Sequence, residues 1–332
     1  MSGMIETRIL GTGKGVPDRV MTNADLEKLV DTSDAWITER TGIRERRILE
    51  DGRVTSDLAA EAGRQACAAA GISPADLDCI IVGTVTPDMP MPATAVFVQH
   101  KLGARIGAAF DLSAACAGFI YGLGVGDALV RSGSHKRVLV VGVEVLSRIL
   151  DWKDRNTCVL FGDAAGAVVL GPAPRGEKPT GVLSTHMYAD GSTWNLLYLP
   201  GGGSALPTSD RSLAENQHVV KMQGKAVFAH AVRNISSACE AALAANHMTA
   251  ADVDLVVAHQ ANLRIIEGVA QRVGLPLTKF FLNIERYGNT SSASIPVALD
   301  EAVRAGVVKP GMTLLLCALG AGFSWGSAVV KW

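Results

Sequence analysis

The sequence predicts an α/β protein built from two similar halves, and three observations lead to this prediction. The 332-residue chain is 48% hydrophobic, which is enough for two cores in halves of about 165 residues each. Short β-branched runs alternate with alanine-rich segments of helical length, as in βα units. One segment of the first half also recurs in the second half. A duplicated α/β fold accounts for this, whereas a solenoid needs shorter and more numerous repeats.

The recurring segment spans residues 67–84 and 243–260, at an offset of 176 residues. Each copy is typical of a helix end, a Ser- or Thr-started acidic turn and a short buried strand. The same offset aligns residues 137–142 with residues 313–318, which form a second buried strand in each half. The order of elements is therefore the same in both halves.

The repeat predicts one shared crevice, because ligands of α/β proteins bind where strands end and helices begin. We divide the chain into an N-terminal half, residues 1–174, and a C-terminal half, residues 175–332. In register, the turn at Cys116 of the first half corresponds to the turn at Asn289 of the second, and His259 ends the repeated strand. We expect these three side chains to lie close together.

Cys116 lies between a predicted strand over residues 105–112 and a predicted buried helix over residues 119–130, which ends at a basic turn and Gly133. A strand-to-helix turn places the sulfur at a helix N-terminus, where free N–H groups and the dipole favour thiolate. This setting suits a nucleophile. The alternative is that Cys116 only fills space, as most buried cysteines do.

His259 follows a predicted strand over residues 255–258, and Asn289 lies in a Gly/Ser/Thr-rich turn over residues 287–296. A histidine at a strand end is often structural, and an asparagine beside glycine is often a turn former. Their predicted proximity to Cys116 favours a functional role for all three.

Composition and charge argue against several classes of protein. The 31 basic and 32 acidic residues give a formal charge of -1, unlike the basic excess of proteins that bind nucleic acid or membrane surfaces. The six cysteines form no CxxC pair and no Cys/His cluster, which argues against metal sites and disulfides. Residues 11–15 miss the dinucleotide-binding spacing. With no signal peptide and no apolar run long enough to span a bilayer, we expect a cytoplasmic protein.

Several motifs resemble those of the β-ketoacyl-[acyl-carrier-protein] synthase III family, which initiates type II fatty-acid synthesis. They are DLSAACAGF (111–119), HQANLRII (259–266) and YGNTSSASIP (287–296), and the similarity extends to residues 32–46, 154–163 and 320–326. The resemblance covers nearly the whole chain. It implies the duplicated thiolase-like fold, with five layers in the order αβαβα.

The resemblance implies an acyltransferase that carries out a decarboxylative Claisen condensation. An acyl-CoA primer, acetyl-CoA or a somewhat longer one, would acylate Cys116, whose N–H acts with one from Gly320 or Ala321 to hold the oxyanion. Malonyl-acyl carrier protein would then lose CO2, and His259 and Asn289 would stabilise the enolate. Acyl-CoA is a substrate here, and neither a metal nor a cofactor is implied.

The resemblance also implies binding roles. An indole face and guanidinium groups can hold the CoA adenine, and the implied CoA-binding residues are Thr32, Trp36, Arg40, Arg155, Phe228 and Asn262. Arg264 matches a position that docks the acidic carrier protein, with Arg272 and Lys225 nearby. Gln271 and Ala229 stand where lysines are expected, so the docking surface is expected to be weaker or shifted.

Two further residues, Met91 and Leu319, match the gate of the primer pocket. A flexible methionine in place of phenylalanine predicts primers longer than acetyl. The resemblance implies a homodimer in which Met91 projects toward the partner's tunnel.

Three alternatives remain. A thiolase needs a second catalytic cysteine, but Ala318 rather than Cys317 aligns with that position, and adjacent strand residues point to opposite faces. A non-catalytic partner that shapes an acyl tunnel would not need Cys116, His259 and Asn289 together. A specialised-metabolism synthase, or an ester-forming acyltransferase with the same three residues, stays open.

Overall fold

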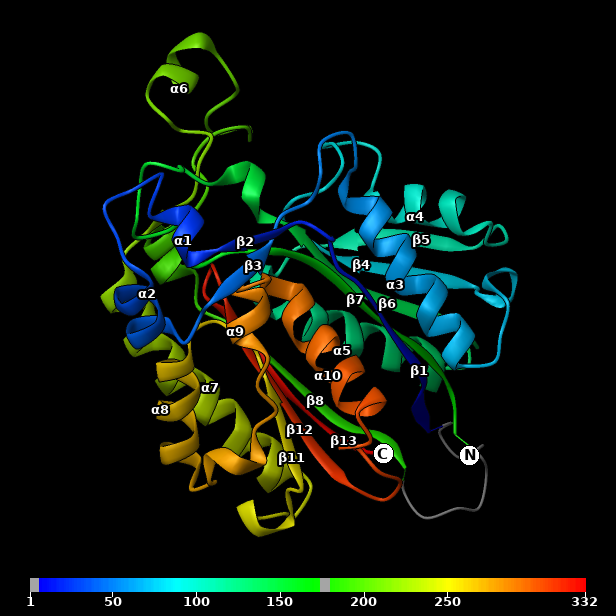
Figure 1. The fold of residues 1–332 in the computed structure, drawn as a ribbon. Coiled ribbons are helices and arrows are strands. Elements are labelled where there is room, and N and C mark those ends of the chain that lie inside the picture. The colour runs from blue at the N-terminus through cyan, green and yellow to red at the C-terminus, as the bar shows by residue number, and fades with distance from the viewer. Residues whose placement is uncertain (1–5, 174–179) are drawn as a thin grey trace.

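The computed structural model describes residues 6–173 and 180–332. Two sheets lie face to face with α5 and α10 between them, α3 and α4 cover the outer face of one sheet, and α7 and α8 cover the other (Figure 1). This arrangement confirms the predicted five-layered αβαβα fold. The strands are β1 (Thr7–Gly15), β2 (Val20–Thr22), β3 (Glu45–Arg47), β4 (Cys79–Gly83), β5 (Ala108–Leu112), β6 (Val138–Val145), β7 (Asp163–Pro172), β8 (Gly181–Ala189), β9 (Leu197–Tyr198), β10 (Lys221–Met222), β11 (Leu255–Ala258), β12 (Thr313–Gly320) and β13 (Ser324–Lys331). The α-helices are α1 (Asn23–Leu26), α2 (Asp34–Thr41), α3 (Thr55–Ala69), α4 (Thr94–Leu102), α5 (Gly118–Arg131), α6 (Asp210–Ala214), α7 (Gly224–Ala245), α8 (Leu263–Val273), α9 (Ile284–Tyr287) and α10 (Ser294–Arg304).

The two large sheets have matching strand orders. The first is β1-β7-β6-β4-β5, and the second, read from its other edge, is β8-β13-β12-β11. In both, the two strands of the recurring sequence segments, β4 with β6 and β11 with β12, pair in parallel. The boundary placed between residues 174 and 175 lies outside the described residues, so the division into domains stays a prediction.

The predicted elements around Cys116 differ slightly from the observed ones. The strand expected over residues 105–112 forms only as β5, and Ile106 before it is fully exposed. The helix expected over residues 119–130 is α5, which follows a 3-10 turn, η2 (Ala115–Ala117). Cys116 is thus in the turn and not in the helix itself. Within the two described ranges, no helix is long and apolar enough to cross a membrane.

The turn that carries Asn289 packs directly on β6 of the first sheet. A Cβ on Gly142 of β6 would lie 2.2 Å from the carbonyl oxygen of Ser292, so only glycine permits this approach. Ser292 belongs to the 3-10 turn η7 (Ser291–Ala293), and its hydroxyl donates to the carbonyl oxygen of Gly83 over 2.8 Å. These contacts connect the candidate site to both halves of the chain.

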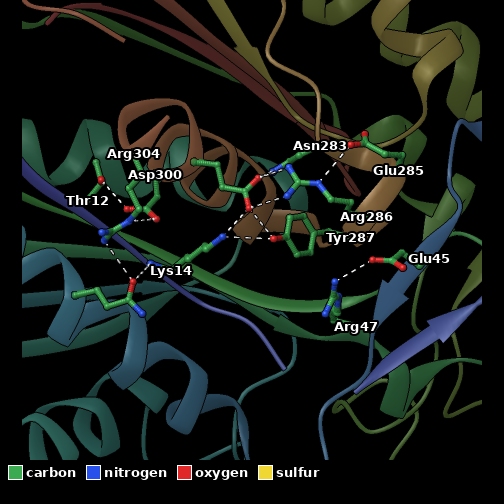
Figure 2. Close-up of polar contacts among 12 residues, drawn as sticks. Thr12, Lys14, Glu45, Arg47, Asn283, Glu285, Arg286, Tyr287, Asp300 and Arg304 are labelled. Carbon is green, nitrogen blue, oxygen red and sulfur yellow. Dashed lines mark hydrogen bonds and ion pairs between the residues drawn. The ribbon is translucent and has the colours of Figure 1, made fainter. Parts of the chain in front are cut away.

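The carboxylate of Glu301 holds the helix before this turn to β1. It accepts hydrogen bonds from Lys14 and the Tyr287 hydroxyl, each over 2.6 Å, and from Arg286 over 2.8 Å and Asn283 over 3.0 Å. Figure 2 shows the four donors converging from β1 and from residues 283–287. Burial raises the pKa of Glu301, but the hydrogen bonds from its neighbours outweigh burial, and its pKa lies below the ordinary 4.5.

We expect Glu301→Ala to lower the free energy of unfolding by about 2 kcal/mol at pH 7. The loss is below the about 3–5 kcal/mol of a fully buried pair, because Lys14 and Arg286 are 29% and 45% exposed and reach solvent. The lowered pKa means that this stabilisation is present above about pH 4.5 and is lost as the pH falls through the folded-state pKa.

Urea unfolding at pH 7 and at about pH 3 measures this effect. Glu215→Ala is the matched control, because among the described residues Glu215 pairs only with Arg211, on the surface, and such pairs contribute about 0.5 kcal/mol. The prediction would be contradicted if the two variants lost equal free energy of unfolding, or if the loss for Glu301→Ala were as large at about pH 3 as at pH 7.

Candidate active site

One cavity of about 720 Å3 brings the three predicted reactive residues together. Cys116 reaches it from η2, His259 from the residue after β11, and Asn289 from the turn after α9. All three are buried, at 7%, 3% and 7% exposure. The proximity expected from the internal repeat is therefore present, although the chemical role of each residue stays a prediction.

Cys116 is held in a strained turn with its sulfur in an apolar setting. Ala115 before it has a positive φ of 46°, a conformation that costs an alanine free energy. Burial raises the pKa of the Cys116 thiol to about 12, and hydrogen bonds from Ser291 and from its own N–H oppose this only in part. Desolvation opposes the stabilisation of thiolate that the helix start was expected to provide, and that expectation stays a prediction. The resting group is a thiol, and its attack requires a proton acceptor.

His259 is a neutral imidazole held by one side-chain partner. Its ring nitrogen Nδ1 lies 2.6 Å from the Ser294 hydroxyl at the start of α10. Its backbone N–H donates to the Cys317 carbonyl oxygen over 2.8 Å. Burial lowers the pKa of His259 to about 3. Because a hydroxyl can donate or accept, Ser294 supports either neutral tautomer. Nε2 can thus accept a proton from a thiol or donate to an anion.

Asn289 presents a hydrogen-bond donor to the cavity. Its N–H donates to Leu160 and its carbonyl oxygen accepts from Gly162, over 2.8 and 3.0 Å. Its side-chain oxygen Oδ1 accepts the N–H of Ser291 over 2.8 Å. These bonds fix the amide plane and leave the Nδ2 donor for a ligand.

The predicted oxyanion donors lie against the cysteine. Gly320 ends β12 so close to η2 that a Cβ on it would lie 2.5 Å from the Cys116 backbone nitrogen. Ala321, the next residue, lines a second cavity with Cys116. Backbone N–H groups beside a nucleophile can serve an oxyanion, and this role of the Cys116 and Gly320–Ala321 backbone stays a prediction.

The second cavity is smaller and strongly apolar. It has a volume of about 170 Å3 and begins at Cys116. Its apolar lining includes Val85, Leu146, Ile149, Phe161, Leu197, Leu199 and Val220. An apolar pocket beside a nucleophile suits an acyl chain.

A cavity of about 380 Å3 continues the large cavity to the surface, with Arg40, Lys225 and Asn262 lining both. Trp36 and Arg155 line its outer part. The guanidinium carbons of Arg40 and Arg155 lie 4.5 and 5.4 Å from the centre of the Trp36 ring. The structure thus joins most of the predicted CoA-binding residues into one channel that leads to Cys116.

The other residues predicted to bind CoA lie at the margins. Phe228 is 40% exposed and lines the large cavity. Thr32 lines none of these cavities, but its hydroxyl is buried and has no hydrogen-bond partner among the described residues. Asn262 caps α8 and donates from Nδ2 to the Arg40 carbonyl oxygen over 3.1 Å.

The predicted docking residues are divided between two places. Arg264 and Arg272 line an open groove on α8, and Arg264 also lies 3.6 Å from Glu39. Gln271 lines the same groove, so the neutral residue stands where a cation was expected. Lys225 lies at the channel mouth.

The two predicted gate residues are not together in a single chain. Leu319 is buried and lines the large cavity. Met91 is 84% exposed and is not among the described residues that line the two cavities at Cys116. A gating role for Met91 stays a prediction that depends on a second subunit.

Sequence reasoning missed three side chains next to the reactive residues. The Ser294 hydroxyl lies 2.6 Å from His259 Nδ1, and Ser291 donates its N–H to Asn289 and lines the small cavity with Cys116. Both serines lie in the 287–296 turn, but nothing in the sequence set them apart from its other small polar residues. Glu144 accepts a hydrogen bond from Ser291. Its functional position could have been suspected from the sequence, because it is the one charged residue in the apolar strand β6.

Comparison with known proteins gives concordant matches. Residues 110–191 match the family described as 3-Oxoacyl-[acyl-carrier-protein (ACP)] synthase III, and residues 243–332 match its C-terminal part. The beta-ketoacyl-[acyl-carrier-protein] synthase III of Natranaerobius thermophilus is 50% identical over 329 residues, which cover 99% of this chain and 100% of that protein. The crystal structure of 3-oxoacyl-[acyl-carrier-protein] synthase III from Aquifex aeolicus VF5 matches with a TM-score of 0.90 and 45% identity, covering 98% of this chain and 100% of that chain. The priming beta-ketosynthase from the R1128 polyketide biosynthetic pathway matches with a TM-score of 0.90 and 36% identity, covering 99% and 97%.

Proposed function

Because the chain belongs to the 3-oxoacyl-[acyl-carrier-protein] synthase III family of acyltransferase-type condensing enzymes, we propose that it joins an acyl-CoA primer to malonyl-acyl carrier protein and so initiates fatty-acid synthesis. One observation carries the proposal: a single cavity system connects the Trp36 mouth to Cys116, His259 and Asn289. A pantetheine arm entering at the mouth would bring its thioester to the thiol.

In the first half-reaction, Cys116 Sγ attacks the thioester carbonyl carbon of the primer. The thiol proton passes to His259 Nε2, whose lone pair is free because burial keeps the ring neutral; the transfer accompanies formation of the S–C bond, since burial also disfavours the protonated ring. The carbonyl oxygen becomes an oxyanion held by the Cys116 N–H and by the Gly320–Ala321 segment. The C–S bond to CoA then breaks, and the departing sulfur takes the proton from His259. The products are acyl-Cys116 and CoA.

In the second half-reaction, malonyl-acyl carrier protein loses CO2 at the same site. The electron pair of the broken C–C bond forms an enolate, whose oxygen accepts hydrogen bonds from His259 Nε2–H and Asn289 Nδ2–H. The enolate carbon attacks the acyl carbonyl carbon, the bond to Cys116 Sγ breaks, and the sulfur takes up one proton from solvent, which replaces the proton that left with CoA. The product is a β-ketoacyl-carrier protein.

The docking surface is the groove on α8 together with Lys225. Arg264 and Arg272 supply positive charge, and complementary charge mainly accelerates encounter with an acidic partner. Glu39 offsets part of the charge of Arg264, and Gln271 adds none. We therefore infer weak docking that depends on more than this groove.

The protein is further proposed to be a cytoplasmic homodimer without a bound metal or cofactor. Strand β5 is an edge of its sheet, and the fully exposed Ile106 precedes it. A second subunit that pairs with this edge would cover it and bring Met91 to a neighbouring tunnel, since exposed sheet edges are usually covered.

We expect primers longer than acetyl to acylate the protein, up to about six carbons. The apolar cavity at Cys116 has a volume of about 170 Å3, and a cavity of about 150 Å3 holds benzene, which has six carbon atoms. Acylation with acyl-CoAs of increasing length, followed by intact mass, measures this limit. Acylation that falls to background above two carbons would show that the cavity is not the primer pocket.

A specialised-metabolism synthase is the second candidate, because the R1128 priming ketosynthase shares the fold at 36% identity. Both candidates predict an acyl adduct, so the acceptor distinguishes them. Incubation with acetyl-CoA followed by malonyl-acyl carrier protein of fatty-acid synthesis, by malonyl-CoA or by a specialised carrier protein tests them directly. Rapid product formation with the fatty-acid carrier supports the main proposal, and absence of any acyl adduct refutes both.

A further inference from the structure

The buried carboxylate of Glu144 joins the two halves of the chain beneath the candidate site. It is fully buried in β6, where all eight residues are buried. Its Oε2 accepts hydrogen bonds from the first half, at the end of β4: Thr86 over 2.7 Å, the Val85 N–H over 3.1 Å and Thr84 over 3.3 Å. Its Oε1 accepts from the second half, from the two serine hydroxyls that begin η7, each over 3.2 Å.

Ser291 connects Glu144 to both reactive side chains. Its hydroxyl donates to Glu144 Oε1, and its N–H fixes Asn289 by donating to Oδ1. Its side chain lines the small apolar cavity together with Cys116, where it lowers the pKa of the thiol. Its φ is +50°, a region that non-glycine residues rarely adopt without surrounding support. The chain therefore holds this serine in an unfavourable conformation at the point where the three groups meet.

We propose that Glu144 and Ser291 form a positioning pair, in which Glu144 anchors the Asn289 turn against Cys116 and Ser291 shares its one hydroxyl hydrogen between the carboxylate and the cysteine sulfur. The inference rests on the proposed roles of Cys116 and Asn289. Neither Glu144 nor Ser291 needs to touch the substrate; each acts through its neighbour.

The single hydrogen of the Ser291 hydroxyl explains how Glu144 and Ser291 affect Cys116. A serine hydroxyl has one hydrogen to donate, so an ionised Glu144 competes with a Cys116 thiolate for it and also repels that thiolate. A neutral Glu144 removes both effects. Burial raises the pKa of Glu144 to about 7, although hydrogen bonds from Thr86, Val85, Ser291 and Ser292 lower it in part, so both forms are populated near neutrality. Cys116 in η2 is the titratable group that faces Glu144. The segment after β4 and the turn η7 present only hydroxyl groups and an N–H to it. The nearby carboxylate of Asp163 in β7 accepts hydrogen bonds from Leu49 and Ser147 and not from the groups that bind Glu144.

The test is the rate at which iodoacetamide alkylates Cys116 between pH 6 and 9, followed by peptide mass mapping. In the wild type, the logarithm of the rate should rise less steeply above about pH 7, where Glu144 ionises. Glu144→Gln should give a straight line of unit slope and about tenfold faster alkylation at pH 8, equivalent to about one unit in thiol pKa. A bend that persists unchanged in Glu144→Gln overturns the proposal.

Ser291→Gly is the complementary variant, because glycine adopts a positive φ freely and keeps the N–H that binds Asn289. It removes the hydroxymethyl group and should slow alkylation several-fold, opposite to Glu144→Gln. Ser291→Ala serves as a second hydroxyl-free variant. Faster or unchanged alkylation in both variants contradicts the shared-hydrogen step.

Two matched controls separate positioning from folding. Ser292→Ala removes a neighbouring hydroxyl that also binds Glu144 and whose nearest partner is Gly83. Asp163→Asn removes a buried carboxylate of the same sheet. Asp163→Asn should lower stability without moving the alkylation profile. Ser292→Ala removes one hydrogen bond that lowers the pKa of Glu144, so it should move the bend to higher pH without removing it. A change in the Asp163→Asn profile as large as that of Glu144→Gln, or loss of the bend in Ser292→Ala, overturns the proposal. Alkylation needs no acyl-CoA, so these results stand apart from any failure of the proposed condensation.

Discussion

Replacing Cys116 by alanine will abolish the acyl adduct that forms on incubation with acyl-CoA, and condensation will fall by on the order of 10^5-fold or more, as for other enzymes that lose their nucleophile. The physical reason is that no other described thiol lines the cavity system that leads from Trp36. Intact mass measures the adduct, and product formation with malonyl-acyl carrier protein measures condensation.

Cys317→Ala is the matched control. Cys317 is a fully buried cysteine of β12, next to Cys239 in the core behind the site, and a thiolase-like mechanism would need a second cysteine near this position. We expect Cys317→Ala to retain the adduct and to change mainly stability. An adduct that persists in Cys116→Ala, or that disappears in Cys317→Ala with the fold intact, would move the nucleophile elsewhere.

His259→Ala and Asn289→Ala will each lower decarboxylation of malonyl-acyl carrier protein by about 10^2- to 10^3-fold, the usual effect of removing one oxyanion donor. Asn289→Ala should still form acyl-Cys116, because the turn keeps its backbone bonds to Leu160 and Gly162 and the amide acts only in the second half-reaction. His259→Ala should slow both half-reactions, because it also removes the proton acceptor. Release of CO2 and intact mass measure the two steps separately.

Asn283→Ala is the control for Asn289→Ala. Asn283 is of the same type, is 2% exposed and binds Glu301 rather than the cavity. It should lose stability without a selective loss of decarboxylation. If both asparagine variants lose decarboxylation equally, the role of Asn289 is structural.

The positions of the three predicted reactive residues could be inferred from the sequence, because local patterns and the internal repeat both indicate them. The helix after Cys116 and the strand before His259 follow from hydrophobic periodicity, which depends on neighbours in the chain. The 176-residue offset then predicted that Cys116 and Asn289 lie at one crevice. The walls of the apolar pocket were not predictable, because Val85, Leu146 and Val220 come from separate segments that share no spacing.

The sequence by itself determined the duplicated α/β architecture and predicted the three reactive groups, because periodicity and motifs are properties of short segments; the five layers followed from the resemblance of those motifs to the family. Only the tertiary structure decided their protonation states and partners. Cys116 is a thiol rather than a thiolate, and Glu144 has a pKa of about 7, because burial by distant segments removes water from the charged forms. Desolvation is produced by the packing of both halves, so no single stretch of sequence encodes it.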